Sequence, residues 1–467
     1  MSTRYNFFGG LVTDSLILNL DAAKLQSYPG TGTNWYDISG NNNNGTLTNG
    51  PTLTGSGKNL AIRFDGTNDY VDVIPPNFNR SETSICMFYR YDNPTVNYPL
   101  LMGNGTSTSN ESFYITSLGP TYGASNLGKI SAFFKAGNTT NQVTGRIDLV
   151  SNIVTTGSSF YLVVTYKTNG TANMYINGTF HLSKPTTSDL LNPQVGSFVL
   201  GGGSPVPVAS DPFNGNISTF QMYNKALSPF DVYQNFNALK GRYGIPDIVT
   251  SGLTLNLDAG NPYSYSPLNT SSTTWVDTTY TTTGGTLING TSYSGGTMVF
   301  DGTDDYARVS DINTASEISI EGWVYANSVG SFNAIASQFQ SDTLAESSWV
   351  LETVGSDIRL YITNNSLLSF ASTSFSTLVW TYIVGTFNGT TIKIYKNSVL
   401  GDITGTIAGL NDSNLNINIG ALYSQNGSEG GTGLWNGKIA NVKIYNRALS
   451  QAEITQNFNA LRGRYGV

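Results

Sequence analysis

Short apolar runs separated by glycine and asparagine turns recur along most of the chain. Residues 160–167 (FYLVVTYK), 172–180, 380–387 and 391–399 are rich in Val, Ile, Tyr and Phe, the residue types that strands favour. The Asn-Gly pair at 169–170 lies between two such runs and is typical of a hairpin turn. Many short strands at this spacing predict a β-sandwich or jelly roll.

Each half of the chain also contains one segment with helical periodicity. Ser228 and Ser450 are good N-cap residues, and apolar side chains then recur every three or four positions through the motif "QNFNAL". We expect the phenylalanine of this motif to face the sandwich. Glycine favours helix ends, so the pattern predicts that the helices stop at Gly241 and Gly463.

The chain is a tandem repeat of a whole domain. "LILNLDAA" matches "LTLNLDAG", "FDGTNDYVDV" matches "FDGTDDYARV", and "QNFNALKGRYGI" matches "QNFNALRGRYGV" in the same order. A repeat of this length indicates two complete domains rather than a solenoid. We predict an N-terminal arm at residues 1–9, a first domain at 10–245, a short linker at 246–251 and a second domain at 252–467.

Composition narrows the classes of function. Only 11% of the residues are charged, and the net charge of −7 with a pI near 4.8 argues against nucleic-acid binding, which depends on basic side chains. The single cysteine, Cys86, excludes an internal disulfide framework. The first residues lack the apolar stretch of a signal peptide, and no long apolar run predicts membrane insertion. We therefore expect folding in a host cytoplasm.

Residues that could support catalysis are few. A glycosidase needs two carboxylates on either side of the scissile bond, and "EISIE" places Glu317, Ser319 and Glu321 on one face of a predicted strand. The first domain has no equivalent, so a polar strand face is the simpler interpretation. The only histidine, His181, and Cys86 are far apart in sequence, and no pattern places them together. The interpretation is therefore that the protein is not an enzyme.

Two acidic turns could hold calcium, which prefers several oxygen ligands. Asp-Gly and Asn-Asp are also ordinary turn residues, so both interpretations stay open. No other cofactor is expected. The candidate ligands lie in "DGTND" and "DGTDD" and are Asp65, Asn68, Asp69, Asp301, Asp304 and Asp305.

The order of these motifs, with "ISIEGWVYA" and "NGKIANVKIYNRALSQAEI", resembles the LamG-like jelly-roll domains of the concanavalin A-like lectin/glucanase superfamily. The resemblance covers nearly the whole chain twice. It implies an all-β fold of two tandem concanavalin A-like jelly-roll β-sandwiches, each ending in a short capped α-helix. Sugar binding is a further possibility in such a fold, and the aromatic loop at residues 261–269 is of the type that sugar sites use.

A narrower resemblance suggests a biological setting. "YPGTGTNWYDISGNNNNGTLTNGPT" and the "NFNALKGRYGI" ending are similar to domains in structural proteins of tailed bacteriophages, especially marine ones. This resemblance implies a non-enzymatic protein on the virion exterior, as a capsid decoration, head fibre, neck or tail-associated subunit. Its partners would be other virion proteins or further copies of itself; the alternatives are a glycan-binding adhesin for host attachment and, third, a glycoside hydrolase. The aromatic side chains Tyr5, Phe7 and Phe8 make the arm a candidate docking segment.

Overall fold

The computed structural model groups the chain into two compact units. They are Met1–Ile245 with Gly466, called domain 1 below, and Pro246–Tyr465 with Val467, called domain 2. Each domain is described by itself. The structure describes residues 10–92, 100–104, 112–119, 123–137, 145–154, 156–193, 198–202, 212–312, 316–340, 344, 346–365, 367–423 and 431–467.

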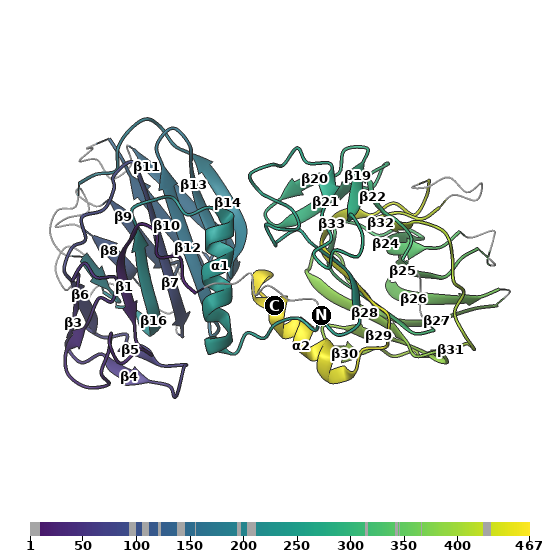
Figure 1. The fold of residues 1–467 in the computed structure, drawn as a ribbon, viewed down its shortest axis with the longest axis horizontal. Coiled ribbons are helices and arrows are strands. Elements are labelled where there is room, and N and C mark those ends of the chain that lie inside the picture. The colour runs from purple at the N-terminus through teal and green to yellow at the C-terminus, as the bar shows by residue number, and fades with distance from the viewer. Residues whose placement is uncertain are drawn as a thin grey trace. The chain divides into compact units, whose positions relative to one another are not determined.

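Domain 1 is a sandwich of two antiparallel sheets (Figure 1). In one sheet, called the covered sheet, the strands follow the order β14 (Thr179–Pro185), β13 (Thr171–Ile176), β12 (Ser159–Lys167), β7 (Glu82–Tyr91), β16 (Asn214–Tyr223), β5 (Ala61–Asp65) and β4 (Thr52–Thr54), with β1 (Leu16–Asp21) also paired to β16. In the other, called the far sheet, the order is β11 (Arg146–Val154), β10 (Lys129–Lys135), β9 (Phe113–Ser117), β8 (Leu100–Asn104), β15 (Phe198–Leu200), β6 (Tyr70–Val73), β3 (Gly45–Thr48) and β2 (Asn34–Trp35).

Domain 2 repeats this plan with the same strand neighbours. Its covered sheet has the order β20 (Ser292–Ser294), β21 (Thr297–Asp301), β33 (Asn436–Tyr445), β23 (Ile318–Ala326), β28 (Thr381–Phe387), β29 (Thr391–Lys396) and β30 (Val399–Leu400), with β17 (Leu253–Asp258) on β33 and β31 (Gly405–Thr406) on β29. Its far sheet has the order β18 (Thr274–Trp275), β19 (Gly285–Ile288), β22 (Tyr306–Val309), β32 (Ile417–Ile419), β24 (Asn333–Gln338), β25 (Trp349–Val354), β26 (Asp357–Asn364) and β27 (Leu367–Ser374).

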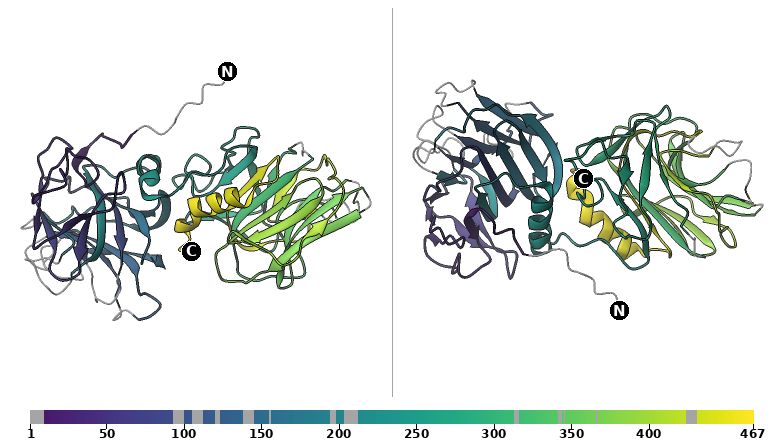
Figure 2. Two further views of the ribbon diagram at one scale, coloured as in Figure 1. Left: turned by 90° about the horizontal axis from the view of Figure 1, so that it is seen from below. Right: turned by 45° about the horizontal axis from the view of Figure 1, so that its top comes forward.

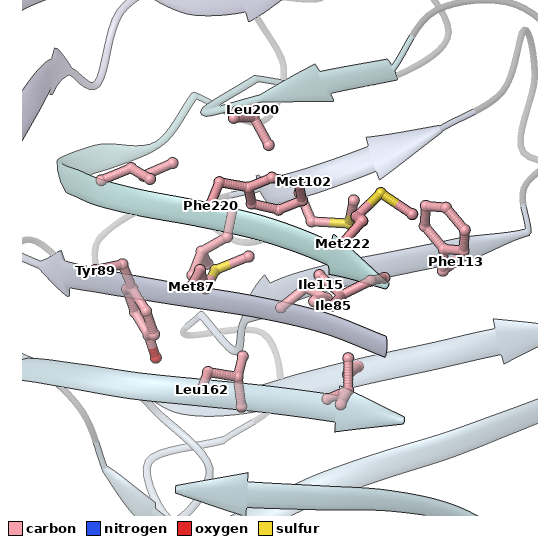
Figure 3. Close-up of a cluster of buried hydrophobic side chains, with 14 of the residues drawn as sticks. Ile85, Met87, Tyr89, Met102, Phe113, Ile115, Leu162, Leu200, Phe220 and Met222 are labelled. Carbon is pink, nitrogen blue, oxygen red and sulfur yellow. The ribbon is translucent and has the colours of Figure 1, made fainter. Parts of the chain in front are cut away.

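Alternation along the strands determines which side chains fill the space between the two sheets. On β7, Ile85, Met87 and Tyr89 point into the core and face Met102 and Ile115 of the far sheet (Figure 3). The intervening residues of β7 point outward and belong to a separate apolar cluster. Both faces of the covered sheet are therefore buried, which explains its nearly continuous apolar sequence.

A terminal helix packs on the outer face of each covered sheet. These helices are α1 (Pro229–Leu239) and α2 (Gln451–Leu461), and Figures 1 and 2 show each lying along its own sandwich. Ser228 and Ser450 cap these helices, as predicted, and each forms a capping box with the acidic residue three positions later. No helix in the described residues is long and apolar enough to cross a membrane.

The predicted ends of the helices were wrong in detail. The α-helices end before Lys240 and Arg462, and each continues as a turn of 3₁₀-helix instead of stopping at Gly241 or Gly463. The left-handed glycine that ends the first copy is Gly244, with φ +71°. The chain keeps a helical conformation through "GRY" because the arginine of this motif pairs with an aspartate of the first strand and the tyrosine stacks on an aromatic ring of the covered sheet.

The observed architecture confirms the predicted fold class. Both domains are β-sandwiches, and each ends in one short capped helix. The helix residue Phe236 is buried against the covered sheet of domain 1, and Phe458 packs against that of domain 2, as the repeated motif indicated.

Candidate functional sites

The acidic turn of domain 2 brings its predicted ligands together. Carboxylate oxygens of Asp301, Asp304 and Asp305 lie within 4.8 Å of one another. The same residues also stabilise their own turn, because the Asp301 amide donates to Asp305 Oδ2 at 3.0 Å. Burial, helped by the two neighbouring carboxylates, raises the pKa of Asp305. These oxygens suit a calcium ion, and calcium binding stays a prediction.

The matching turn of domain 1 has a weaker ligand set. Asp65 and Asp69 flank Asn68, which occupies the place of the third carboxylate. The Asp65 amide donates to Asp69 Oδ2 at 3.0 Å, and the Thr67 amide donates to Asp65 Oδ1 at 2.7 Å. Both carboxylates therefore already hold the turn. The predicted docking residues Tyr5, Phe7 and Phe8 lie outside the described residues.

The strand that carries the candidate glycosidase carboxylates faces the protein's own terminal helix. Ser319 Oγ donates to the Arg447 carbonyl, and the Ala448 amide donates to Glu317. Glu321 is fully buried, and its Oε1 lies 3.0 Å from Nζ of Lys443, which is also buried. Glu317, directly before β23, and Ser319 and Glu321 on β23 lie on one face as predicted, but α2 and the segment before it cover that face.

Domain 1 has uncharged residues at the positions of Glu321 and Lys443, whereas the position of Glu317 is occupied by Glu82, which accepts from the Ala226 amide. Cys86 lies opposite Gln221 as Glu321 lies opposite Lys443. Burial raises the pKa of the Cys86 thiol to about 12, so the thiolate is disfavoured. His181 is on β14, which two strands separate from β7 and Cys86 in the sheet order, and it accepts a hydrogen bond from the Asn152 amide. The structure does not bring these two residues together.

An asparagine that the sequence did not single out holds the start of each domain. Asn235 Oδ1 accepts from the Val12 amide at 2.8 Å, and Tyr223 donates to the Val12 carbonyl at 3.0 Å. In domain 2, Asn457, Tyr445 and Val249 make the same two bonds, at 2.7 and 3.1 Å. Both backbone groups of the leading valine are thus satisfied. The signal for this role was the identical asparagine in both copies of "QNFNAL".

The "GRYG" motif closes each domain with an ion pair. Arg242 donates to both carboxylate oxygens of Asp21, at 2.8 and 2.6 Å, and Arg464 donates to both oxygens of Asp258, at 2.9 and 2.8 Å. All four side chains are largely buried. The motif therefore joins the end of each domain to its first strand.

The outer face of the far sheet in domain 2 carries an aromatic and charged cluster, called the domain 2 patch. Tyr361 and Phe370 lie on adjacent strands with ring centroids 5.1 Å apart. The Arg359 guanidinium lies 4.7 Å from the centre of the Phe370 ring and donates to the Tyr361 hydroxyl at 2.8 Å. Glu352 faces Arg359 across the strand pair. The neighbouring Leu360 points into the core, so these four side chains point outward.

Domain 1 has a related cluster on its own far sheet. Tyr114 and Phe133 stack with ring centroids 5.2 Å apart. The Arg146 guanidinium lies 4.1 Å from the centre of the Phe133 ring and pairs with Asp148 at 2.6 Å. In both domains, an aromatic pair, an arginine and an acidic residue therefore lie on the far sheet, which no helix among the described residues of that domain covers. Strand alternation was the signal for this face, but only the fold identifies which sheet carries it.

Glu352 gives domain 2 a distinctive pH dependence. Only 5% of the residue is exposed, and among the described residues its Oε2 has no hydrogen-bond partner. Burial raises the pKa of Glu352 to about 7, although Arg359 opposes this shift. The folded state therefore retains a proton that the unfolded chain loses above its ordinary pKa of 4.5. We expect the free energy of unfolding to fall by about 3 kcal/mol between pH 4.5 and 7 and then to level off.

Urea unfolding of the full chain as a function of pH measures this contribution. Five of the six tryptophans lie in domain 2, so tryptophan fluorescence reports mainly on this domain. Glu352→Gln keeps the shape of the side chain without its titration and should remove the fall between pH 4.5 and 7. An unchanged pH profile in the variant would show that the fall comes from other groups.

Comparisons with known proteins agree with the jelly-roll architecture. Residues 65–233 and 301–455 match the family Laminin_G_3, described as the concanavalin A-like lectin/glucanases superfamily. No curated protein sequence matches the chain. Solved structures with a similar fold include domain 4 of AbnA, a GH43 extracellular arabinanase from Geobacillus stearothermophilus, in complex with arabinotriose. It has 16% identity and a TM-score of 0.34, over 45% of this chain and 99% of that chain.

Two further solved structures are similar over most of the chain. One is the botulinum neurotoxin serotype D ligand-binding domain in complex with N-acetylneuraminic acid, with 12% identity and a TM-score of 0.38, over 87% of this chain and 96% of that chain. The other is domains LG4-5 of the mouse laminin alpha1 chain, with 12% identity and a TM-score of 0.26, over 79% of this chain and 86% of that chain. The family match spans both domains and most of the chain, and the chain therefore belongs to the concanavalin A-like lectin/glucanases superfamily.

Proposed function

We propose that the protein is a non-enzymatic attachment protein that binds carbohydrate through the domain 2 patch. The observation that carries this proposal is the arrangement of Tyr361, Phe370 and Arg359 on the outer face of the far sheet. Aromatic rings offer an apolar face to a sugar ring, and the guanidinium and the hydroxyl offer hydrogen bonds to its hydroxyl groups.

The covered sheet supports the non-enzymatic part of the proposal. Glu321, one of the two candidate glycosidase carboxylates, lies beneath α2 and pairs with Lys443. A substrate would have to displace the helix before it could reach this carboxylate. In the part of each domain that the structure describes, no helix lies on the far sheet, which favours the far sheets as binding surfaces.

Glycan-array binding of the full chain tests the proposal. We expect specific binding to a limited set of oligosaccharides, and Phe370→Ala or Arg359→Ala should weaken it about tenfold, which corresponds to about 1.4 kcal/mol. Tyr280→Ala, which removes an aromatic ring that is 75% exposed elsewhere in domain 2, serves as the matched control and should bind normally. The absence of glycan binding, or equal loss in the control, would contradict the proposal.

Repeating the glycan array in the presence of a calcium chelator distinguishes a sugar site at the domain 2 patch from a calcium-dependent sugar site at the acidic turns. Binding that persists in chelator supports the domain 2 patch as the site. Loss of binding in chelator would indicate instead that the sugar site includes Asp301, Asp304 and Asp305, the cluster with metal-ligand spacing.

A structural role in a phage-like virion is the second candidate function. The observation that favours it is that a buried ion pair joins the end of each domain to its first strand, and that Asn235 or Asn457 binds the leading valine. Such closure of both domains suits a stable subunit on the exterior of a particle. This candidate function includes the prediction that the arm at residues 1–9 docks the protein onto another virion protein. If deletion of that arm leaves incorporation into particles unchanged, docking must occur through another surface.

A further inference from the structure

Three buried side chains, two on the covered sheet of domain 2 and one on α2, have an arrangement that the proposed binding function does not use. Lys443 Nζ lies 3.0 Å from Glu321 Oε1, and Asn457 Nδ2 donates to Glu321 Oε2 at 2.8 Å. Asn441 Oδ1 accepts a further hydrogen bond from Lys443 Nζ at 3.2 Å. Glu321 and Asn457 are completely buried, and the Lys443 side chain is 1% exposed. An amine and a carboxamide are thus bonded to the two oxygens of a single carboxylate.

The surroundings suit an attack of the amine on the amide carbon. Asn457 Oδ1 accepts from the Val249 amide at 2.7 Å, and such a donor stabilises the negative charge that develops on a carbonyl oxygen under attack. The Glu321 carboxylate can take a proton from the ammonium and return it to the departing nitrogen. The helix excludes water, which would otherwise compete for the amide.

We propose that Lys443 and Asn457 form an intramolecular isopeptide bond in the folded protein. Lys443 first passes a proton to Glu321, which replaces two buried charges with neutral groups. The free amine then attacks Cγ of Asn457, a bond forms between Nζ and Cγ, and the bond from Cγ to Nδ2 breaks. The departing nitrogen takes the proton from Glu321 and one from the attacking amine and leaves as ammonium, which restores the Glu321 carboxylate. No oxidant or other reactant is required.

Domain 1 supplies an internal comparison. Asn235 has the same hydrogen bond from a leading valine as Asn457, so the amide is held in the same way. Cys86 and Gln221 occupy the positions of Glu321 and Lys443, so both the amine and the carboxylate are missing. The bond is therefore confined to domain 2, where it would join β33 covalently to α2 and keep the terminal helix on its sheet under load.

Mass spectrometry of the purified full chain tests the bond. We expect an intact mass lower than that of the sequence by one ammonia. After trypsin digestion, the peptide 439–447, which is uncut at Lys443, should be joined to the peptide 448–462 through Asn457. Cyclisation at an Asn-Gly pair also releases ammonia, so the joined peptide is the decisive observation. An intact mass equal to that of the sequence, or a link from Lys443 to Asn441, would overturn the proposal.

Two variants test whether the joined peptide and the lower mass depend on Lys443 and Glu321. Lys443→Arg removes the nucleophile, and the double change Glu321→Cys with Lys443→Gln installs the residues that domain 1 uses at these positions. Both should restore the full mass and eliminate the joined peptide. Persistence of the joined peptide in either variant would also overturn the proposal. Neither variant alters the domain 2 patch, so glycan binding and the isopeptide bond can fail independently.

Discussion

Replacing Asp258 with asparagine is expected to destabilise domain 2 by about 3–5 kcal/mol, because removal of one partner leaves the other charge buried and unpaired. Arg464 donates to both oxygens of Asp258, and the two side chains are 6% and 8% exposed. Asparagine keeps the size of the side chain but offers one acceptor and no charge. The loss should appear as a lower urea midpoint for the tryptophan fluorescence transition.

An exposed ion pair provides the matched control. Glu82 and Lys167 approach only to 4.0 Å and are 34% and 61% exposed, so Glu82→Gln should change stability by less than about 1 kcal/mol. The equivalent change in domain 1, Asp21→Asn, removes the partner of Arg242 and should again be costly. Equal effects at Asp21 and Glu82, which both lie in domain 1, would show that the "GRYG" ion pair is not a stabilising closure.

The repeat made much of this fold predictable from sequence. Apolar alternation, Asn-Gly turns and the serine caps are local signals, and they indicated a tandem sandwich with one helix per copy. The ends of the helices were less predictable, because the turn after Leu239 depends on a contact between Arg242 and Asp21. These residues are more than two hundred positions apart, and only the topology brings them together.

The candidate sites were harder to predict for the same reason. "EISIE" correctly placed Glu317 and Glu321 on one face, but sequence alone could not show that α2 would cover that face. Lys443 looked like an ordinary strand lysine, and its role becomes visible only because β33 pairs with β23. The domain 2 patch combines residues from β25, β26 and β27, none of which forms a compact motif in the sequence.

Removal of the Trp323 ring should be at least as damaging as loss of the ion pair. Trp323 is fully buried between the covered sheet and the end of the chain. Its ring centroid lies 4.3 Å from that of Tyr465 and 5.6 Å from that of Phe458. Trp323→Ala leaves a cavity between α2 and the sheet, so we expect a loss of about 3–5 kcal/mol. The urea midpoint, followed through the remaining tryptophans, measures it.

The corresponding residue of domain 1 indicates which substitution of Trp323 domain 2 should tolerate. Phe88 occupies the place of Trp323 and stacks on Tyr243 with ring centroids 3.7 Å apart. Trp323→Phe keeps an aromatic ring and removes an indole N–H that is buried and has no partner among the described residues. Its cost should therefore be only about 1 kcal/mol. The reciprocal change, Phe88→Trp, inserts a larger ring beside Tyr243 and should destabilise domain 1 by about 1–3 kcal/mol. If Trp323→Phe proved as damaging as Trp323→Ala, the shape of the indole, rather than its burial against the terminal helix, would be what stabilises domain 2.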